Sequence, residues 1–396
     1  MRISVIVPTL GFGSTVKTLL NALKNQTISI DEIILVDSSI DNEVMSIFKD
    51  YEDSLSLKYF KVESLFPGEA RNFGIRKSNG DLIAILDSKT IPQKNWLERG
   101  IRKINQSNFD IVFGSTAYIA HTKVQKIIQA CTYGKNPVET TPGSIFPRNV
   151  FEQIGDFIEG TRTGDDLEWR NRAKHCGLSF YSPSESLQTY DNISKSIFAE
   201  FKRAFIYQLH GAKLDVQQRA RIVIFGISII FITLLIPQWN NIVGWESSPW
   251  YIENITKSYF YGLSIFSLII LVISHKFNQL VRNIWFRFLA VSIFLLSFYF
   301  IFKWNAAMAG WVEDSIYYIP HITKIYISLL LFCSLCYRGI FIPISRGVAS
   351  QSIFPLNWLV IGFVGLIIDL AKFPGYFIGA ILGIARLAKN ANRRTN

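Results

Sequence analysis

Residues 67–97 of this 396-residue chain combine charged side chains with a short apolar run. A Pro-Gly loop is followed by a predicted helix that carries Arg71. The wholly apolar residues 82–86 predict a strand buried on both faces of an α/β sheet, and this strand ends on Asp87. Open α/β sheets hold their ligands outside the carboxyl ends of the strands. The stretch therefore indicates a nucleotide-diphosphate site, and the simpler interpretation is a surface carboxylate that ends a strand.

Composition bounds the class of protein. Hydrophobic residues make up 49% of the chain and charged residues 18%, which is too apolar for one ordinary soluble domain and predicts membrane segments. The formal net charge of +11 suits a protein that rests on anionic lipid or handles phosphates. The sequence has no basic low-complexity tail, which argues against nucleic acid as a partner. Cys333 and Cys336 form a Cys-x-x-Cys pair without a second pair, so a zinc site is not expected.

Strands and helical segments alternate through the N-terminal part. The apolar runs 3–7 and 33–36 predict strands, residues 16–23 between them have helical spacing, and the second strand ends on Asp37. This alternation predicts an α/β domain with a mostly parallel sheet flanked by helices. The later stretch 141–148 is typical of a loop because it contains Pro and Gly.

Four stretches resemble family 2 glycosyltransferases of the GT-A fold. They are VIVPTLG at 5–11, ILVDSSID at 34–41, ARNFGIRKSNGDLIAILDSKTIP at 70–92 and GDDLEWRNRAKHCG at 164–177. All four occur in the family's order, over roughly one domain's length. The resemblance implies a Rossmann-like GT-A sheet and an inverting transfer of sugar from a nucleotide-sugar donor.

The resemblance assigns the donor site to the first three stretches. An Asp at the end of the second strand touches the base of the sugar nucleotide in the family, and that residue is Asp37 here. Capping of a helix or turn is the alternative for this Asp. The residues that we place at the donor are Pro8, Thr9, Asp37, Arg71, Asp87 and Lys89.

The chain departs from the family's Asp-x-Asp motif, because it has Asp87-Ser88-Lys89 there. In the family these carboxylates hold a divalent cation that bridges the donor phosphates. A protonated lysine cannot ligate a cation. Under the favoured hypothesis, Asp87 keeps Mg²⁺ or Mn²⁺ together with the phosphates and water. Under the other, Lys89 supplies the positive charge itself.

An acidic pair, Asp165 and Asp166, opens a predicted helix. The pair matches the family's Glu/Asp-Asp motif, whose second member is the general base. We therefore assign proton acceptance to Asp166, with Asp165 as its capping or orienting neighbour. Helix capping is the alternative for Asp166 as well. Arg170 and Arg172 follow near the family's position for arginines that meet the pyrophosphate. The Gln-x-x-Arg-Trp motif of processive synthases is missing, which argues against long-chain polymerisation.

Residues 195–213 place aromatic and aliphatic side chains on one helical face with Lys202 and Arg203 beside it. This pattern favours a helix in the lipid headgroup layer or, equally, one packed on the catalytic domain. Residues 356–387 predict either a hairpin or an interfacial helix. Four further apolar runs are membrane-span candidates, at 222–236, 259–274, 284–302 and 322–337.

The loop charges orient these spans. Basic residues flank them on one side and acidic residues on the other, which puts the catalytic domain in the cytoplasm. We predict a catalytic domain at 1–193, an interfacial helix or linker at 194–215 and a membrane domain at 216–396, in a bacterial-type inner or plasma membrane.

Two functions remain after the sequence analysis. The first is a membrane-bound glycosyltransferase for a lipid-linked acceptor, either a polyprenyl phosphate or a lipid-linked glycan, in cell-envelope or extracellular polysaccharide synthesis. The second is a catalytically weakened homologue that acts as a binding or scaffolding subunit, motivated by the lost carboxylate. Joint retention of Asp37, Asp87 and Asp166 favours the enzyme.

Overall fold

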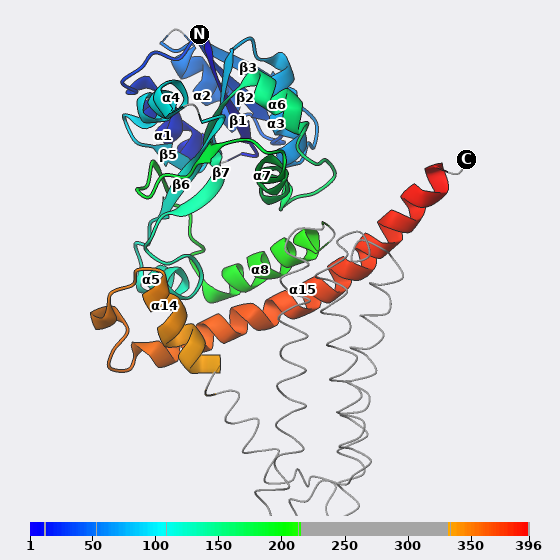
Figure 1. Cartoon of the computed structure of the whole chain (residues 1–396). Helices are drawn as coiled ribbons and strands as arrows, with labels where there is room; N and C mark the ends of the chain where they lie inside the picture. Colours follow the sequence, from blue (N-terminus) through cyan, green and yellow to red (C-terminus); the bar gives the residue numbers. More distant parts are fainter. Residues whose placement is uncertain are drawn as a thin grey trace, which may run out of the picture. The chain divides into compact units, whose positions relative to one another are not determined.

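A mixed sheet is the framework of the N-terminal region (Figure 1). A computed structural model describes residues 1–11, 13–52, 54–107, 109–212, 214, 332 and 334–394. Within this part of the chain the sheet has nine strands. Their order is β3 (Leu57–Lys61), β2 (Glu32–Asp37), β1 (Ile3–Thr9), β4 (Leu82–Ile85), β7 (Val138–Pro147), β6 (Ile111–Tyr118), β9 (Gln188–Tyr190) and β5 (Thr90–Pro92), with β8 (Phe180–Tyr181) beside β6.

The predicted α/β class with a mostly parallel sheet is confirmed. Strands β3, β2, β1 and β4 pair in parallel, and five of the eight pairings among the described strands are parallel. The antiparallel pairings come from β7, which lies between β4 and β6, and from β5 at the edge. This curled mixed sheet with flanking helices fits the predicted GT-A fold.

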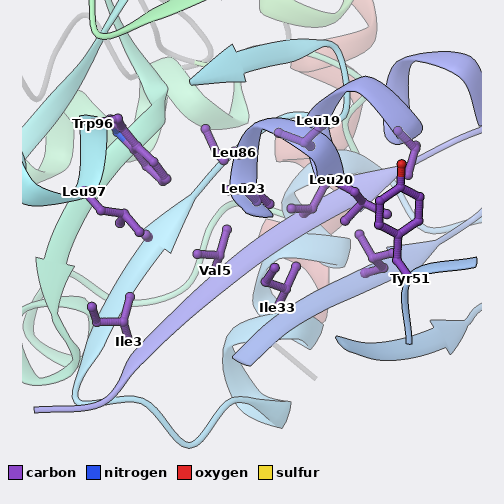
Figure 2. Packing of buried hydrophobic residues seen from close by; sticks show 14 of the residues in the cluster. Ile3, Val5, Leu19, Leu20, Leu23, Ile33, Tyr51, Leu86, Trp96 and Leu97 are labelled. Atoms are coloured by element: carbon purple, nitrogen blue, oxygen red, sulfur yellow. The ribbon is translucent and has the colours of Figure 1, made fainter. Parts of the chain in front are cut away.

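Helices cover both faces of the sheet. The helices α1 (Gly13–Lys24), α2 (Glu43–Tyr51) and α4 (Trp96–Ser107) bury their apolar side chains in one core cluster. Figure 2 shows this cluster, in which Val5 and Ile33 of the strands pack with Leu20 of α1. The helices α3 (Pro67–Lys77), α6 (Arg148–Ile154) and α7 (Asp165–His175) contribute to the second cluster.

Side chains of the central strands alternate between these two clusters. Val5 and Val7 of β1 belong to the first cluster, whereas Ile6 belongs to the second. Successive residues of a strand point to opposite faces, so a strand covered on both faces must be apolar throughout. The continuous apolar runs in the sequence therefore predicted these strands correctly.

The prediction of a loop at 141–148 was wrong, because most of this stretch belongs to strand β7. The Pro-Gly pair produces an irregularity within the strand instead of ending it. The register between β6 and β7 shifts between Val112 and Gly114, and Gly143 has φ of +89°. Glycine tolerates this left-handed conformation, and the local bulge lets the antiparallel pairing continue on both sides.

Helix α8 (Ile197–Gly211) packs on the C-terminal segment of the chain. Phe201 and Phe205 are half-buried against a cluster that includes Ile361 and Val364 of α15 (Asn357–Arg394), whereas Phe198 is 76% exposed. Residues Met1–Val216 and Ser334–Gly379 form one compact unit. Two phenylalanines of this helix therefore pack in a cluster formed mainly by the C-terminal segment, together with Ala130 and Cys131; a place in the lipid headgroup layer stays a prediction.

The C-terminal segment contains one long helix. A π-helix at Tyr337–Phe341, the short helix α14 (Ile342–Ser345) and a 3₁₀-helix at Ser350–Ser352 lead into α15, which continues through Pro374. The hairpin alternative for 356–387 is therefore wrong.

The predicted spans fall outside the described residues, apart from the end of the last one. In the part of the chain that the structure describes, no helix has the length and apolarity required to cross a bilayer.

Candidate active site

Three predicted site residues lie at the carboxyl ends of neighbouring strands. Thr9 of β1 is paired with Asp37 of β2, and Asp87 follows β4 on the other side of β1. The amide of Leu86 donates to the carbonyl of Ile6 at 3.0 Å, which keeps the end of β4 against β1. The sheet order therefore gathers these residues at the edge where α/β folds bind ligands.

Arg71 of α3 joins the two acidic stretches that the sequence singled out. Its Nη2 donates to Oδ1 of Asp87 at 2.7 Å, and its Nη1 donates to Oδ2 of Asp165. The side chains of Arg71 and Asp165 are only 4% and 3% exposed, whereas that of Asp87 is 38% exposed. The arginine is thus a buried bridge, and Asp87 is the member of this bridge that reaches solvent.

Negative charges outnumber positive ones around Arg71. Burial alone would lower the pKa of Arg71, but Asp165, Asp87 and Asp166 raise it well above its ordinary value. Burial raises the pKa of Asp165 to about 7; Arg71 opposes this shift, and the other two carboxylates add to it. Three carboxylates around one guanidinium create a field that favours an additional positive charge.

The position of Arg71 is fixed by contacts at the N-terminal end of α3. Asn72 donates to the carbonyl of Phe157 at 2.9 Å and accepts from the amide of Phe157 at 2.8 Å. At Gly68, a Cβ would lie 2.5 Å from the carbonyl oxygen of Ile158, so only glycine allows this approach. Helix α3 is therefore held against the loop that leads into α7, which brings Arg71 to Asp165.

Asp166 lies beside the bridge, in the first turn of α7. Its Oδ1 accepts from the amide of Leu167 at 2.8 Å, and its carbonyl accepts from Thr141 Oγ1 at 2.8 Å. The side chain is half-buried. This contact with the helix backbone is compatible with both predicted roles, so general-base catalysis by Asp166 stays a prediction.

Asp37 is completely buried and surrounded by donors. Its carboxylate accepts from Ser39 Oγ at 2.6 Å, Tyr59 Oη at 2.7 Å and Lys61 Nζ at 3.1 Å. Burial alone would raise the pKa of Asp37, but these hydrogen bonds outweigh burial and keep the pKa below its usual value. Contact of Asp37 with a nucleotide base stays a prediction; in the structure this residue organises Ser39 and Lys61.

The other predicted donor residues lie in turns at the same edge. Thr9 is buried and donates to the carbonyl of Gly11 at 3.1 Å, and Pro8 precedes it in β1. After Asp87, the amide and hydroxyl of Thr90 both donate to the Asp87 carbonyl, at 3.0 and 2.7 Å. This tight turn carries Lys89, whose pKa is lowered by burial and by Arg203, while Asp87 opposes the shift.

Arg170 and Arg172 lie with other partners. Arg170 Nη1 donates to the carbonyl of Glu139 at 2.7 Å. The Arg172 guanidinium donates to the carbonyls of Ile154 and Asp156 at 2.6 and 2.7 Å. These contacts tie α7 to β7 and to the end of α6. They do not support the predicted pyrophosphate role, which stays a prediction.

Sequence analysis missed an aromatic cluster next to Lys89. The cluster consists of Tyr118, Tyr133, Tyr190 and Tyr207, with Arg203 of α8 against three of the rings. Helical spacing had placed Arg203 only as a basic flank of an apolar face. Its neighbours come from distant segments, so no local pattern could reveal them.

A family model matches the same region. Residues 4–157 match the model described as Glycosyl transferase family 2. The chain is 28% identical over 194 residues to Glycosyltransferase AglE of Haloferax volcanii, which covers 45% of this chain and 62% of that protein. It is 28% identical over 116 residues to Poly(ribitol-phosphate) beta-N-acetylglucosaminyltransferase TarS of Staphylococcus aureus, which covers 28% of this chain and 20% of that protein. The chain thus spans less than two thirds of the length of either relative.

Solved structures give weaker likenesses. Staphylococcus aureus TarS 1-349 in complex with UDP-GlcNAc is 16% identical with a TM-score of 0.41, covering 70% of this chain and 93% of that chain. Mannosyltransferase PcManGT from Pyrobaculum calidifontis in complex with GDP-Man and Mn²⁺ is 15% identical with a TM-score of 0.45, covering 94% of this chain and 87% of that chain.

Residues 4–157 are therefore similar to glycosyltransferases of family 2. The matched segment contains Arg71 and Asp87. Its end at residue 157 precedes the acidic pair, Asp165 and Asp166, which the Arg71 bridge connects to it.

Replacement of Arg71 tests the bridge. We expect Arg71→Met to lower the free energy of unfolding by about 3–5 kcal/mol, because it leaves the buried Asp165 carboxylate without its partner. Arg76→Met is the matched control on the same helix, since the Arg76–Asp156 pair is exposed; its cost should stay below about 1 kcal/mol. Chemical unfolding followed by circular dichroism measures both. Adding Asp165→Asn to Arg71→Met should restore part of the loss, and equal costs for the two arginines would contradict the bridge.

Proposed function

We propose that the protein is a membrane-bound inverting glycosyltransferase that moves a sugar from a nucleotide-sugar donor to a lipid-linked acceptor. The observation that carries this proposal is the Arg71 bridge, which connects the exposed Asp87 at the strand ends to the acidic start of α7. The family match of residues 4–157 supports the reaction class. A scaffold without activity would have no need to keep this arrangement intact.

The donor diphosphate is placed at the carboxyl ends of β1, β2 and β4. Asp87 is the exposed carboxylate there, and the turn after it carries Lys89. Thr9 ends β1, and Asp37 ends β2 on the side of β1 away from Asp87, which is the side that the nucleoside would occupy. A site of this kind acts mainly by orienting the phosphates and by offsetting charge as the nucleoside diphosphate leaves.

Asp166 is the proposed general base. As the acceptor hydroxyl oxygen forms its bond to the anomeric carbon, its proton passes to the Asp166 carboxylate. The bond from the anomeric carbon to the phosphate oxygen breaks, and the leaving nucleoside diphosphate takes the electron pair. The amide of Leu167, in the first turn of α7, donates to Oδ1 of Asp166 and holds the carboxylate in place for this step.

A divalent cation fits the site in a restricted way. Among the described residues, no group of three or more His, Cys, Asp or Glu side chains forms a ready metal site. Oδ1 of Asp87 accepts a hydrogen bond from Arg71. We therefore propose Oδ2 of Asp87 as the one metal ligand that the chain supplies. Magnesium commonly takes one or two carboxylates, with substrate phosphates and water as the other ligands. When bound, such a cation would neutralise charge on the diphosphate.

Membrane attachment and the lipid-linked acceptor are proposed from the second half of the chain. The apolar runs between 222 and 337 supply enough hydrophobic length for spanning helices. Large apolar side chains are also exposed on the C-terminal segment, including Phe341, Leu356, Phe363 and Leu370. Exposed apolar surface of this extent is typical of a face that meets lipid or another protein. An acceptor held at the bilayer would therefore reach a cytoplasmic donor site.

Two carboxylate substitutions should separate donor binding from catalysis. Asp87→Asn should lower sugar transfer by about 100-fold or more, because it removes the carboxylate proposed to hold the cation that neutralises the leaving diphosphate. Asp166→Asn should lower kcat while donor affinity stays nearly unchanged, as expected for a group that acts in the transition state. Donor affinity is measured by titration with the nucleotide sugar, and transfer by mass detection of product in lipid extract.

The matched control for these variants is Asp156→Asn, which alters an exposed carboxylate in the loop before α7. Near-normal transfer by Asp87→Asn would remove Asp87 from the site. Loss of donor affinity in Asp166→Asn would move Asp166 to the nucleotide.

Chelation separates the two hypotheses for positive charge. With Asp87 holding a cation, excess chelator should stop turnover and added Mg²⁺ or Mn²⁺ should restore it. Lys89→Ala should then cost much less than chelation does, since one ammonium beside a hydrated phosphate contributes only about 1–3 kcal/mol. Full activity in excess chelator, together with loss of activity in Lys89→Ala, would make Lys89 the principal positive group.

A further inference from the structure

Arg203 is held mainly by aromatic rings, with one long ion pair to Glu200. Its Cζ lies 5.1 Å from the ring centroid of Tyr207, 5.5 Å from that of Tyr133 and 5.9 Å from that of Tyr190. The nearest carboxylate is that of Glu200, whose Oε2 is 3.8 Å from Nη1, beyond hydrogen-bond distance. Within the described part of the chain, no side chain or carbonyl accepts a hydrogen bond from this guanidinium. The rings hold the guanidinium by cation–π contacts, so among the described residues its N–H donors have no hydrogen-bond acceptor.

The tyrosines connect Arg203 to the turn after Asp87. Strand pairing places Tyr190 opposite both Thr90, the neighbour of Lys89, and Tyr118. The ring of Tyr118 stacks on Tyr133 at 4.1 Å and lies 5.3 Å from that of Tyr190. The cluster therefore lies between α8 and the Lys89 turn.

The same helix also contacts the loop before the acidic pair. Thr163 Oγ1 donates to the carbonyl of Tyr207 at 3.3 Å, and the amide of Arg162 donates to His210 Nδ1 at 3.4 Å. Burial raises the pKa of Tyr118 to about 12; Arg203 opposes this shift, and Asp166 and Asp87 add to it. Arg203 thus shares one electrostatic environment with the catalytic carboxylates.

Two cations in one partly desolvated environment repel each other. Arg203 is 18% exposed, and its charge lowers the pKa of the half-buried Lys89. A doubly charged anion bound between the two cations would offset this repulsion and accept hydrogen bonds from the N–H groups of Arg203. A phosphate group has the charge and the oxygens for this role, whereas a neutral sugar does not.

We propose that Arg203 and Lys89 bind a phosphate group on the α8 side of the active site. This inference rests on the proposed function, because it deepens the assignment of the acceptor. The phosphate comes either from a lipid-linked acceptor or from the donor diphosphate. Since the donor diphosphate is already assigned to the cation proposed at Asp87, we expect the acceptor.

The test measures binding of two kinds of phosphate to the full-length purified protein by calorimetry. Decyl phosphate stands for a lipid phosphate, with decanol as the control for its tail, and UDP and GDP stand for the donor. Arg203→Gln should weaken decyl phosphate binding about tenfold or more, because a charge-assisted contact is lost. Arg203→Lys should give an intermediate loss, since it keeps the charge but not the planar fork. Lys202→Gln, an exposed neighbour, should bind as the wild type does.

The outcomes separate the sources. Loss of decyl phosphate binding alone assigns the site to the acceptor, and loss of UDP or GDP binding alone assigns it to the donor diphosphate. Unchanged binding of both, in a variant that keeps its melting temperature, would overturn the phosphate site, and so would a wild type that binds neither. A wild type that binds decyl phosphate but neither nucleotide, and hydrolyses no donor, would refute the proposed function without refuting this site.

Discussion

A single buried arginine determines how the acidic groups of this protein are arranged. Arg71 connects a carboxylate after β4 with one at the start of α7, and both the arginine and Asp165 are almost fully removed from solvent. Burying an ion pair costs desolvation free energy, but burying one charge without its partner costs far more. The pairing therefore holds the start of α7 near the end of β4, and Asp166 is the next residue of that helix.

The surrounding elements depend on this constraint. Helix α3 is held at its start by Gly68 and Asn72 against the loop at Phe157, so the arginine has little freedom to turn away. The central strands are buried on both faces and give this edge a rigid base. A sugar transfer at this edge would thus use side chains that are already held in position, which lowers the entropic cost of orienting the reactants.

The sequence predicted those features that depend on residues close together in the chain. Continuous apolar runs predicted the central strands, and Asp87 was predicted because it directly follows one of them. The Pro-Gly pair at 142 and 143 misled the prediction, since a bulge and a loop have the same local composition. Arg203 was missed because its partners Tyr133, Tyr190 and Tyr207 come together only through strand pairing and helix packing. The Arg71–Asp165 contact spans 94 positions, so the two motifs gave no sign of touching.

Hydrogen–deuterium exchange on the full-length protein tests the central claim most directly. The purified protein would be compared with and without a saturating nucleoside diphosphate. We expect slower exchange at the ends of β1, β2 and β4, and also at the first turn of α7, because the Arg71 bridge couples that turn to the donor edge. Protection confined to other surfaces, or protection of the strand ends with no change at α7, would contradict the account.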